Sequence, residues 1–234
     1  MPRMGEGLIR LADGQGTAVE LRRSRRARRL SLRVSSLDGK VTLTLPPGVS
    51  HREARRFVEE KSDWIAGALS RRPDEVRVTE GAEVPVEGIA RRVVPGTGRS
   101  ARLLPSSITA PSGREGPAVV ALLKSLARDR LAQASDRHAR ALGRSYSRLT
   151  LRDTRSRWGS CSTDGNLMYS WRLILAPPEV LDYVAAHEVA HLARMDHSPA
   201  FWEEVRALCP TYAAPRAWLR REGAALHRFR FSAD

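Results

Sequence analysis

The segment His187-Glu188-Val189-Ala190-His191 carries the side chains best suited to chemistry in this chain of 234 residues. It follows Pro177-Pro178 in a stretch, residues 179–194, that we expect to be helical. Because four residues turn through about 400° in an α-helix, the two imidazoles would lie on one face, one turn apart. Both could then bind a single Zn²⁺ ion, with Glu188 beside them as a base for water.

This motif is specific. With six His and fifteen Glu in the chain, it is expected by chance about 0.01 times. A third histidine, His197, lies six residues after His191, so half of the six histidines fall within eleven residues. The neighbouring positions are mostly apolar or small, which predicts a buried helix, where unpaired polar groups destabilise the fold. Metal coordination would satisfy them, and three imidazoles favour zinc.

Other motifs accompany the histidines. They are Asp153–Ser162, which includes Arg157-Trp158-Gly159-Ser160-Cys161, then Trp171–Pro177, and His197–Trp202. With the His-Glu motif they resemble the YgjP-like metallopeptidase family, which belongs to the zincin-like metallopeptidases and is related to the SprT-type proteases. Arg23–Pro46 and Lys61–Ile65 resemble the N-terminal part of that family, so the resemblance covers most of the chain.

The resemblance implies roles for four residues. His187, His191 and His197 would bind one catalytic Zn²⁺ ion, and Glu188 would be the general base that activates water. The ligand spacing equals that of the metzincins, which have glycine where this chain has Arg194. We therefore expect the third ligand to arrive by a different backbone path.

Arg157, Trp158 and Ser160 are candidate contacts of a substrate in the cleft, although a tight corner with Trp158 in the core explains them as well. We expect Cys161 to be a structural thiol, because catalytic zinc usually keeps three protein ligands and a water. Asp196 could orient a ligand imidazole, or it could be an ordinary loop acid. Tyr183 and Tyr212 could assist an oxyanion, although we expect both in the core. We expect the other three histidines, His51, His138 and His227, to be solvated at the surface.

The elements that must position these residues indicate an α+β fold with a β-rich N-terminal subdomain. The alternation over 30–34 and 41–45, around Asp38-Gly39, predicts a hairpin, and Ser50 with Glu53 predicts the capping box of a helix. The expected domains are a loose N-terminus over 1–16, the subdomain with one helix over 17–95, a connection over 96–117 and a zincin-like hydrolase over 118–234. The last would begin with a helix to Leu142, contain strands 149–153 and 171–175 in a partly antiparallel sheet, and end with helices from Pro199 and over 214–227.

The composition indicates the cellular compartment and the possible partners of the protein. The chain has 40 Lys+Arg against 26 Asp+Glu, a formal charge of +14, and only two cysteines, far apart, so a disulfide framework is not expected. It has no apolar run long enough for a membrane span, and we expect a cytoplasmic protein with no membrane partner. Six arginines gather within Arg22–Arg29. The oligomeric state is left open.

Three functions remain for the structure to distinguish. The first is a zinc metallopeptidase acting on a peptide or protein substrate. The second is a metal-dependent hydrolase of nucleotide phosphoanhydrides, a pyrophosphatase, because arginine forks match phosphate oxygens and four arginines precede the metal helix: Arg152, Arg155, Arg157 and Arg172. The third is a nucleic-acid-associated, SprT-like protease whose Arg22–Arg29 cluster contacts the nucleic acid.

Overall fold

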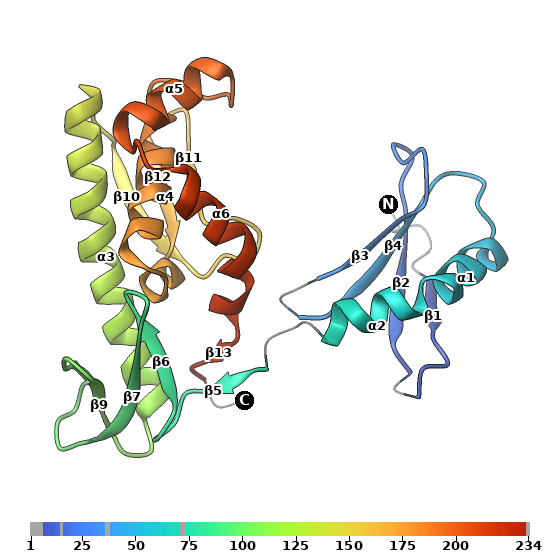
Figure 1. Ribbon diagram of the computed structural model, residues 1–234, viewed down its shortest axis with the longest axis horizontal. Coiled ribbons are helices and arrows are strands. Elements are labelled where there is room, and N and C mark those ends of the chain that lie inside the picture. The colour runs from blue at the N-terminus through green and yellow to red at the C-terminus, as the bar shows by residue number, and fades with distance from the viewer. Residues whose placement is uncertain (1–6, 15, 36–37, 71–73, 233–234) are drawn as a thin grey trace. The chain divides into compact units, whose positions relative to one another are not determined.

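The structure, a computed structural model, describes residues 7–14, 16–35, 38–70 and 74–232 (Figure 1). The chain divides into two compact units, which we call unit 1 (Met1–Asp74) and unit 2 (Glu75–Asp234). This division differs from the expected boundary after residue 95. The reason is that the strands following Asp74 bury their apolar side chains, among them Val84 and Val93, in the core of unit 2.

Unit 1 is a four-stranded sheet that packs one face against two helices. Its strand order is β1-β2-β4-β3, with β2 and β4 parallel and the other pairs antiparallel. Alternate strand residues such as Val19 and Leu43 are fully buried against Val58 and Ile65 of the helices. The elements are β1 (Gly7–Arg10), β2 (Ala18–Arg23), β3 (Ser31–Val34), β4 (Val41–Leu45), α1 (His51–Glu60) and α2 (Ser62–Ser70).

The local motifs predicted for unit 1 are present. Strands β3 and β4 form the antiparallel hairpin, and Gly39 has the positive φ of 70° expected in its turn, whose Leu37 lies outside the described residues. The capping box is confirmed, because the Ser50 amide donates to Glu53 and the Glu53 amide donates to Ser50. The single expected helix is two helices, separated at Lys61.

Unit 2 is organised around the long helix α3, along which its strands and other helices are placed (Figure 1). It contains a four-stranded sheet in the order β6-β7-β9-β8, a three-stranded sheet β10-β12-β11 and the parallel pair β13-β5. The elements are β5 (Val76–Arg77), β6 (Glu83–Val86), β7 (Ile89–Gly96), β8 (Arg102–Leu103), β9 (Ser107–Pro111), α3 (Glu115–Leu142), β10 (Arg148–Arg152), β11 (Gly159–Cys161), β12 (Asn166–Ser170), the 3₁₀-helix η1 (Trp171–Leu175), α4 (Pro178–Ala190), α5 (Pro199–Leu208), α6 (Ala213–Glu222), the 3₁₀-helix η2 (Gly223–His227) and β13 (Phe229–Arg230).

Two segments of unit 2 differ from expectation. Residues 171–175, expected as a strand, form η1, and the strand that pairs with β10 is β12 just before it. The expected connection over 96–117 contains β8 and β9, and Ile108 and Ala110 of β9 are buried. The fold is nevertheless α+β, and helix α3 ends at the predicted Leu142 and α5 begins at the predicted Pro199.

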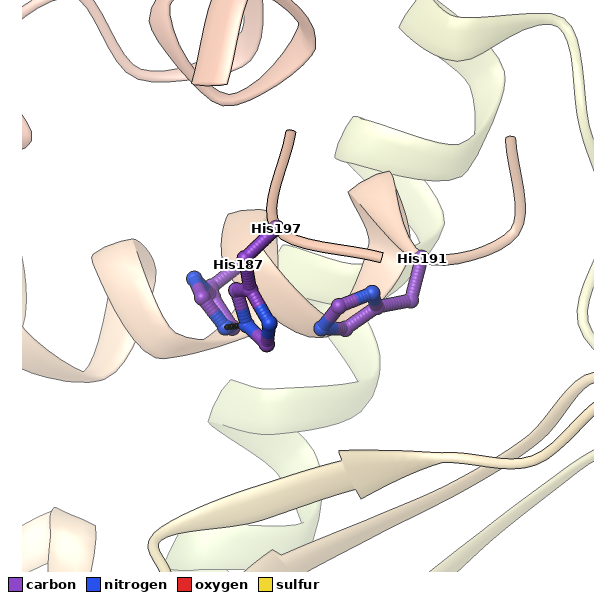
Figure 2. Close-up of side chains that lie close together, drawn as sticks. All are labelled: His187, His191 and His197. Carbon is purple, nitrogen blue, oxygen red and sulfur yellow. Dashed lines mark hydrogen bonds between the residues drawn. The ribbon is translucent and has the colours of Figure 1, made fainter. Parts of the chain in front are cut away.

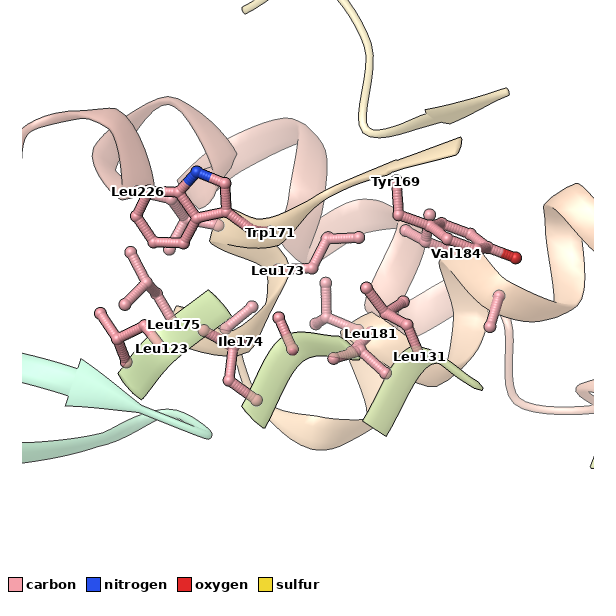
Figure 3. Packing of buried hydrophobic residues seen from close by; sticks show 14 of the residues in the cluster. Leu123, Leu131, Tyr169, Trp171, Leu173, Ile174, Leu175, Leu181, Val184 and Leu226 are labelled. Atoms are coloured by element: carbon pink, nitrogen blue, oxygen red, sulfur yellow. The ribbon is translucent and has the colours of Figure 1, made fainter. Parts of the chain in front are cut away.

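The core of unit 2 lies where η1 passes between α3 and the neighbouring elements (Figure 3). Trp171, Leu173 and Ile174 are nearly inaccessible and pack with Leu123 and Leu131 of α3. Because all five residues of η1 are buried, this segment fixes the start of α4, which follows after Ala176 and Pro177. No helix of the described residues is long and apolar enough to cross a membrane.

Two histidines expected at the surface are buried instead. His138 is 4% exposed on α3, and its Nε2 lies 2.9 Å from Asp182 Oδ1 on α4. His227 is 8% exposed, and its ring centroid lies 5.1 Å from that of Trp158. The arginine-rich surroundings suggested solvent, but α3 and α4 pack closely enough to enclose His138. His51 is exposed, as predicted.

Candidate metal centre

Three imidazoles converge at the end of α4 (Figure 2). One ligand nitrogen from each of His187, His191 and His197 lies within 4.8 Å of the others. The Nε2 atoms of His187 and His197 are 3.2 Å apart. The structure therefore brings together the three residues that the sequence nominated as metal ligands.

The backbone explains how His197 reaches the other two. Helix α4 ends at Ala190, four residues earlier than predicted, and His191 is its C-cap. The chain then turns through bonds from the Leu192 and Arg194 amides back to carbonyls of α4. Among the described residues other than glycine, only Glu87 has a positive φ, so Arg194 needs no left-handed conformation. The loop therefore reaches His197 without a left-handed residue at position 194.

Two contacts hold the loop in place. The Asp196 carboxylate accepts hydrogen bonds from the amide and hydroxyl of Ser198. Ser198 also caps α5, since its Oγ accepts from the Phe201 amide. Asp196 thus fastens the backbone beside His197, and among the described residues its carboxylate bonds Ser198 rather than a ligand imidazole. A capped helix start fixes where His197 leaves the loop.

Hydrogen bonding and burial favour the neutral, metal-binding form of His187 and His191. His191 Nδ1 lies 2.9 Å from the Arg194 carbonyl oxygen and donates to it, which leaves Nε2 unprotonated and directed at the cluster. Burial, together with the neighbouring His191 and His197, lowers the pKa of His187 to about 3. Burial likewise lowers the pKa of His191. Both side chains are therefore uncharged at neutral pH, as metal ligands must be.

The donor set fits a zinc ion. Two nitrogens bound to a tetrahedral Zn²⁺ at about 2.0–2.1 Å lie about 3.4 Å from each other. The 3.2 Å between His187 Nε2 and His197 Nε2 is close to that value. Among the described residues, His187 Nδ1 is buried without a hydrogen-bond partner, and Nε2 is the ring nitrogen that faces His197. Three imidazoles are a ligand set that zinc prefers.

Aromatic rings wall the cluster. Phe201 is fully buried, and its ring centroid lies 4.4 Å from that of His191 and 4.9–5.0 Å from those of His197 and His187. Trp202 lies 5.6 Å from His187 and carries the Arg216 guanidinium over its ring at 4.2 Å. The sequence did not single out Phe201 as part of the site. The available signal was its position three residues after Ser198, in the first turn of the helix that begins just after His197.

Glu188 lies on α4 beside the histidines and is 6% exposed. Burial raises the pKa of Glu188 to about 8, although the nearby Arg157 opposes the rise. A carboxyl group with a pKa near neutrality can both accept and release a proton at physiological pH. The arrangement therefore offers a proton-transfer group next to a metal-binding cluster.

Strand β11 passes over Glu188 at the edge of its sheet, where it pairs only with β12 among the described strands. The alternation of a strand places Gly159 and Cys161 on one face and Ser160 on the other. Gly159 is the residue in contact with Glu188, so the Ser160 hydroxyl lies on the far face of the sheet. Burial and Glu188 raise the pKa of Cys161 to about 11, as suits a structural thiol.

The other two candidate contacts are placed differently from each other. Arg157 is exposed and close enough for its charge to act on Glu188. Trp158 is half-buried and packs against His227 and Gly223, at the margin of the core. Tyr183 is buried, with its ring 6.0 Å from His187, and stacks on Tyr212.

The arginines considered for phosphate binding do not gather at the site. Arg172 is buried, bonds Asp153 through two nitrogens, and donates to the carbonyls of Leu226 and Phe229. A guanidinium so engaged has a structural role and is not free to bind a ligand. Of the four arginines, Arg157 is the one whose charge acts on Glu188.

This combination, an α+β fold whose buried helix and following loop bring three histidines together beside a glutamate, defines the class of metal-dependent hydrolases with a His-Glu-x-x-His helix. Within that class, the chain belongs to the YgjP-like family, whose metallopeptidase domain matches residues 28–222. A search of curated proteins finds no match. Among solved structures, the metallopeptidase zymogen abylysin of Pyrococcus abyssi aligns with 22% identity over 40% of this chain and 92% of its own, at a TM-score of 0.35.

Proposed function

We propose that the protein is a zinc-dependent metallopeptidase that binds one catalytic Zn²⁺ ion through His187, His191 and His197 and uses Glu188 as general base. The observation that carries the proposal is the convergence of the three imidazoles beside the buried Glu188 carboxylate. Membership of a metallopeptidase family supports a peptide or protein substrate.

Each protein group has a defined part in the reaction. When bound, the zinc ion lowers the pKa of water and polarises a carbonyl group. Glu188 accepts the proton of the attacking water and passes it to the leaving amine. The exposed backbone edge of β11 pairs with an extended substrate, and Arg157 contacts it at the rim. Tyr183, whose ring centroid lies 6.0 Å from that of His187, is the candidate to assist a developing oxyanion.

Glu188→Gln tests the general base. The amide keeps the shape of the side chain but cannot accept a proton at neutral pH, so we expect turnover to fall by about 10²-fold or more. Zinc content, measured on the purified protein, should stay at the wild-type level. His197→Ala is the control, in which zinc itself should be lost. Undiminished turnover in Glu188→Gln would refute the role of Glu188.

A second assay identifies the kind of bond that the protein cleaves. The purified protein is incubated with an unstructured protein and, separately, with nucleoside triphosphates, each with and without chelator. Chelator-sensitive cleavage of the protein supports the proposal. Chelator-sensitive release of pyrophosphate or phosphate, with no cleavage of the protein, would support the phosphoanhydride hydrolase instead.

A second activity, contact with nucleic acid, is favoured by the charge distribution of unit 1. Residues 21–35 contain seven arginines and no acidic residue, and the seven side chains are exposed: Arg22, Arg23, Arg25, Arg26, Arg28, Arg29 and Arg33. In the described part of the chain, none of them forms an ion pair with a carboxylate, whereas Arg55 and Arg56 of α1 pair with Glu59 and Glu60. Unpaired guanidinium groups are suited to phosphates.

Serine substitution of Arg25, Arg26 and Arg28 tests this contact. We expect duplex DNA and RNA affinity to fall at least tenfold, and the slope of log K against log salt to decrease by about two to three. The same change at Arg52, Arg55 and Arg56 removes equal charge from α1 and is the matched control. Equal losses in both variants, or no salt-dependent binding by the wild-type chain, would exclude a specific surface.

A further inference from the structure

We infer that Gly159 is a positioning residue for Glu188: the space left by its missing side chain holds the Glu188 carboxyl group beside the three histidines. The inference rests on the proposed function, in which Glu188 is the general base. The inference adds Gly159, which lies on a different element, β11. The only role it gives to Gly159 is to leave room for the Glu188 carboxyl group.

The contact leaves no room for a Cβ at position 159 unless the Glu188 side chain moves. A Cβ placed on Gly159 would lie 2.6 Å from both Cγ and Oε1 of Glu188, and 2.7 Å from its Cδ. Carbon atoms that are not bonded normally stay about 3.5–4.0 Å apart. The φ of Gly159 does not lie in the left-handed region, so the requirement for glycine comes from this contact and not from the backbone conformation.

Packing, not hydrogen bonding, sets the position of Glu188. Among the described residues, no hydrogen bond or ion pair reaches its carboxylate, and Arg157 acts on it only through its charge. A buried carboxyl group without a directional partner takes whatever rotamer its neighbours allow. The Gly159 backbone is therefore the wall that defines where the carboxylate lies.

Strand β11 cannot move away to admit a side chain. Gly159 is paired with Tyr169 of β12, whose ring is fully buried and whose hydroxyl lies 3.0 Å from the hydroxyl of Ser135 on α3. The preceding residue is held as well, because the Ser170 amide donates to the Trp158 carbonyl over 2.8 Å. Displacing the strand would break these contacts.

Helix α4 is equally constrained on the other side of the contact. Ala185, Val189 and Ala190 surround Glu188 in the sequence, and all three are 0% exposed. Close-packed interiors do not absorb an extra methyl group without shifting side chains. With both backbones fixed, a methyl group at position 159 must push the Glu188 side chain away from its place beside His187.

A double-mutant cycle on the full chain, without metal, measures the contact directly. The proteins are wild type, Gly159→Ala, Glu188→Ala and the double variant, and the readout is the melting temperature. The Glu188→Ala change removes Cγ, Cδ and Oε1, the three atoms in conflict. Gly159→Ala should lower the melting temperature by about 5 °C or more in the wild-type background, and by much less in the Glu188→Ala background. Gly98→Ala, which adds the same methyl where the nearest atom is 3.8 Å away, is the control.

Activity and metal content complete the test. Gly159→Ala loaded with zinc should keep the wild-type metal content and KM but lose at least tenfold in kcat, since the ligands stay and the base moves. Equal falls in melting temperature in the wild-type and Glu188→Ala backgrounds, failure of the double variant to fold, or full kcat in Gly159→Ala would overturn the inference. An inactive wild-type chain that still shows the coupling would refute the proposed function and not the contact.

Discussion

The buried Arg172 of η1 bonds the Asp153 carboxylate, and its charge also acts on His227. Burial raises the pKa of Asp153, but the hydrogen bonds and charge of Arg172 outweigh it and leave the pKa below its usual value. Burial, and then the charge of Arg172, lowers the pKa of His227 to about 4. The folded chain therefore favours an ionised Asp153 and a neutral His227, so protonation of either residue in acid opposes folding.

The pH dependence of folding should report His227. Its pKa is about 4 in the folded chain against an ordinary value of 6.5, so unfolding takes up a proton between these values. The contribution of His227 to the free energy of unfolding, on the order of 3 kcal/mol, should be lost as the pH drops from 6.5 to about 4 and should change no further below. His227→Phe, which keeps a ring against Trp158, should lose that part of the decline.

Urea unfolding of both proteins in chelator, from about pH 7.5 to 4, is the measurement. The pKa of His187 is also low, but His187 is present in both proteins, so its contribution cancels in the difference. Parallel stability curves would show that His227 does not titrate on unfolding in this range.

At the scale of elements, local signals predicted best. The capping box of Ser50 and Glu53 and the hairpin of β3 and β4 are set by neighbours in sequence, and both are present. Buried runs were ambiguous. Trp171–Leu175 has strand-like composition, but all its residues are buried, and a short apolar run does not distinguish a buried strand from a helical turn.

The candidate site divides in the same way. The i, i+4 spacing of His187 and His191 predicts that both lie on one helix face. The resemblance to the YgjP-like family nominated His197, and the structure brings all three together. The contact between Gly159 and Glu188 joins residues 29 apart in sequence and depends on how β11 pairs with β12. No local pattern specifies that pairing, so the reason for the glycine could only be seen in the fold.

The whole molecule consists of two units with separate cores. The buried cluster of unit 1 ends at Ile65, and that of unit 2 begins at Val78, with no residue in common. The first and last strands of unit 2 also pair with each other, since β5 is parallel to β13. The histidine cluster, Glu188 and every element that positions them belong to unit 2.

Residues 75–234 alone should therefore fold and bind zinc. With its core complete, this fragment should bind about one zinc ion per chain, and zinc should raise its melting temperature as much as it raises that of the full chain. His187→Ala in the fragment is the control and should abolish the shift. A fragment that folds but binds no zinc, when the full chain does, would mean that unit 1 completes the metal centre. Retained cleavage of an unstructured protein by the fragment, with loss of salt-dependent nucleic-acid binding, would assign the chemistry to unit 2 and the arginine surface to unit 1.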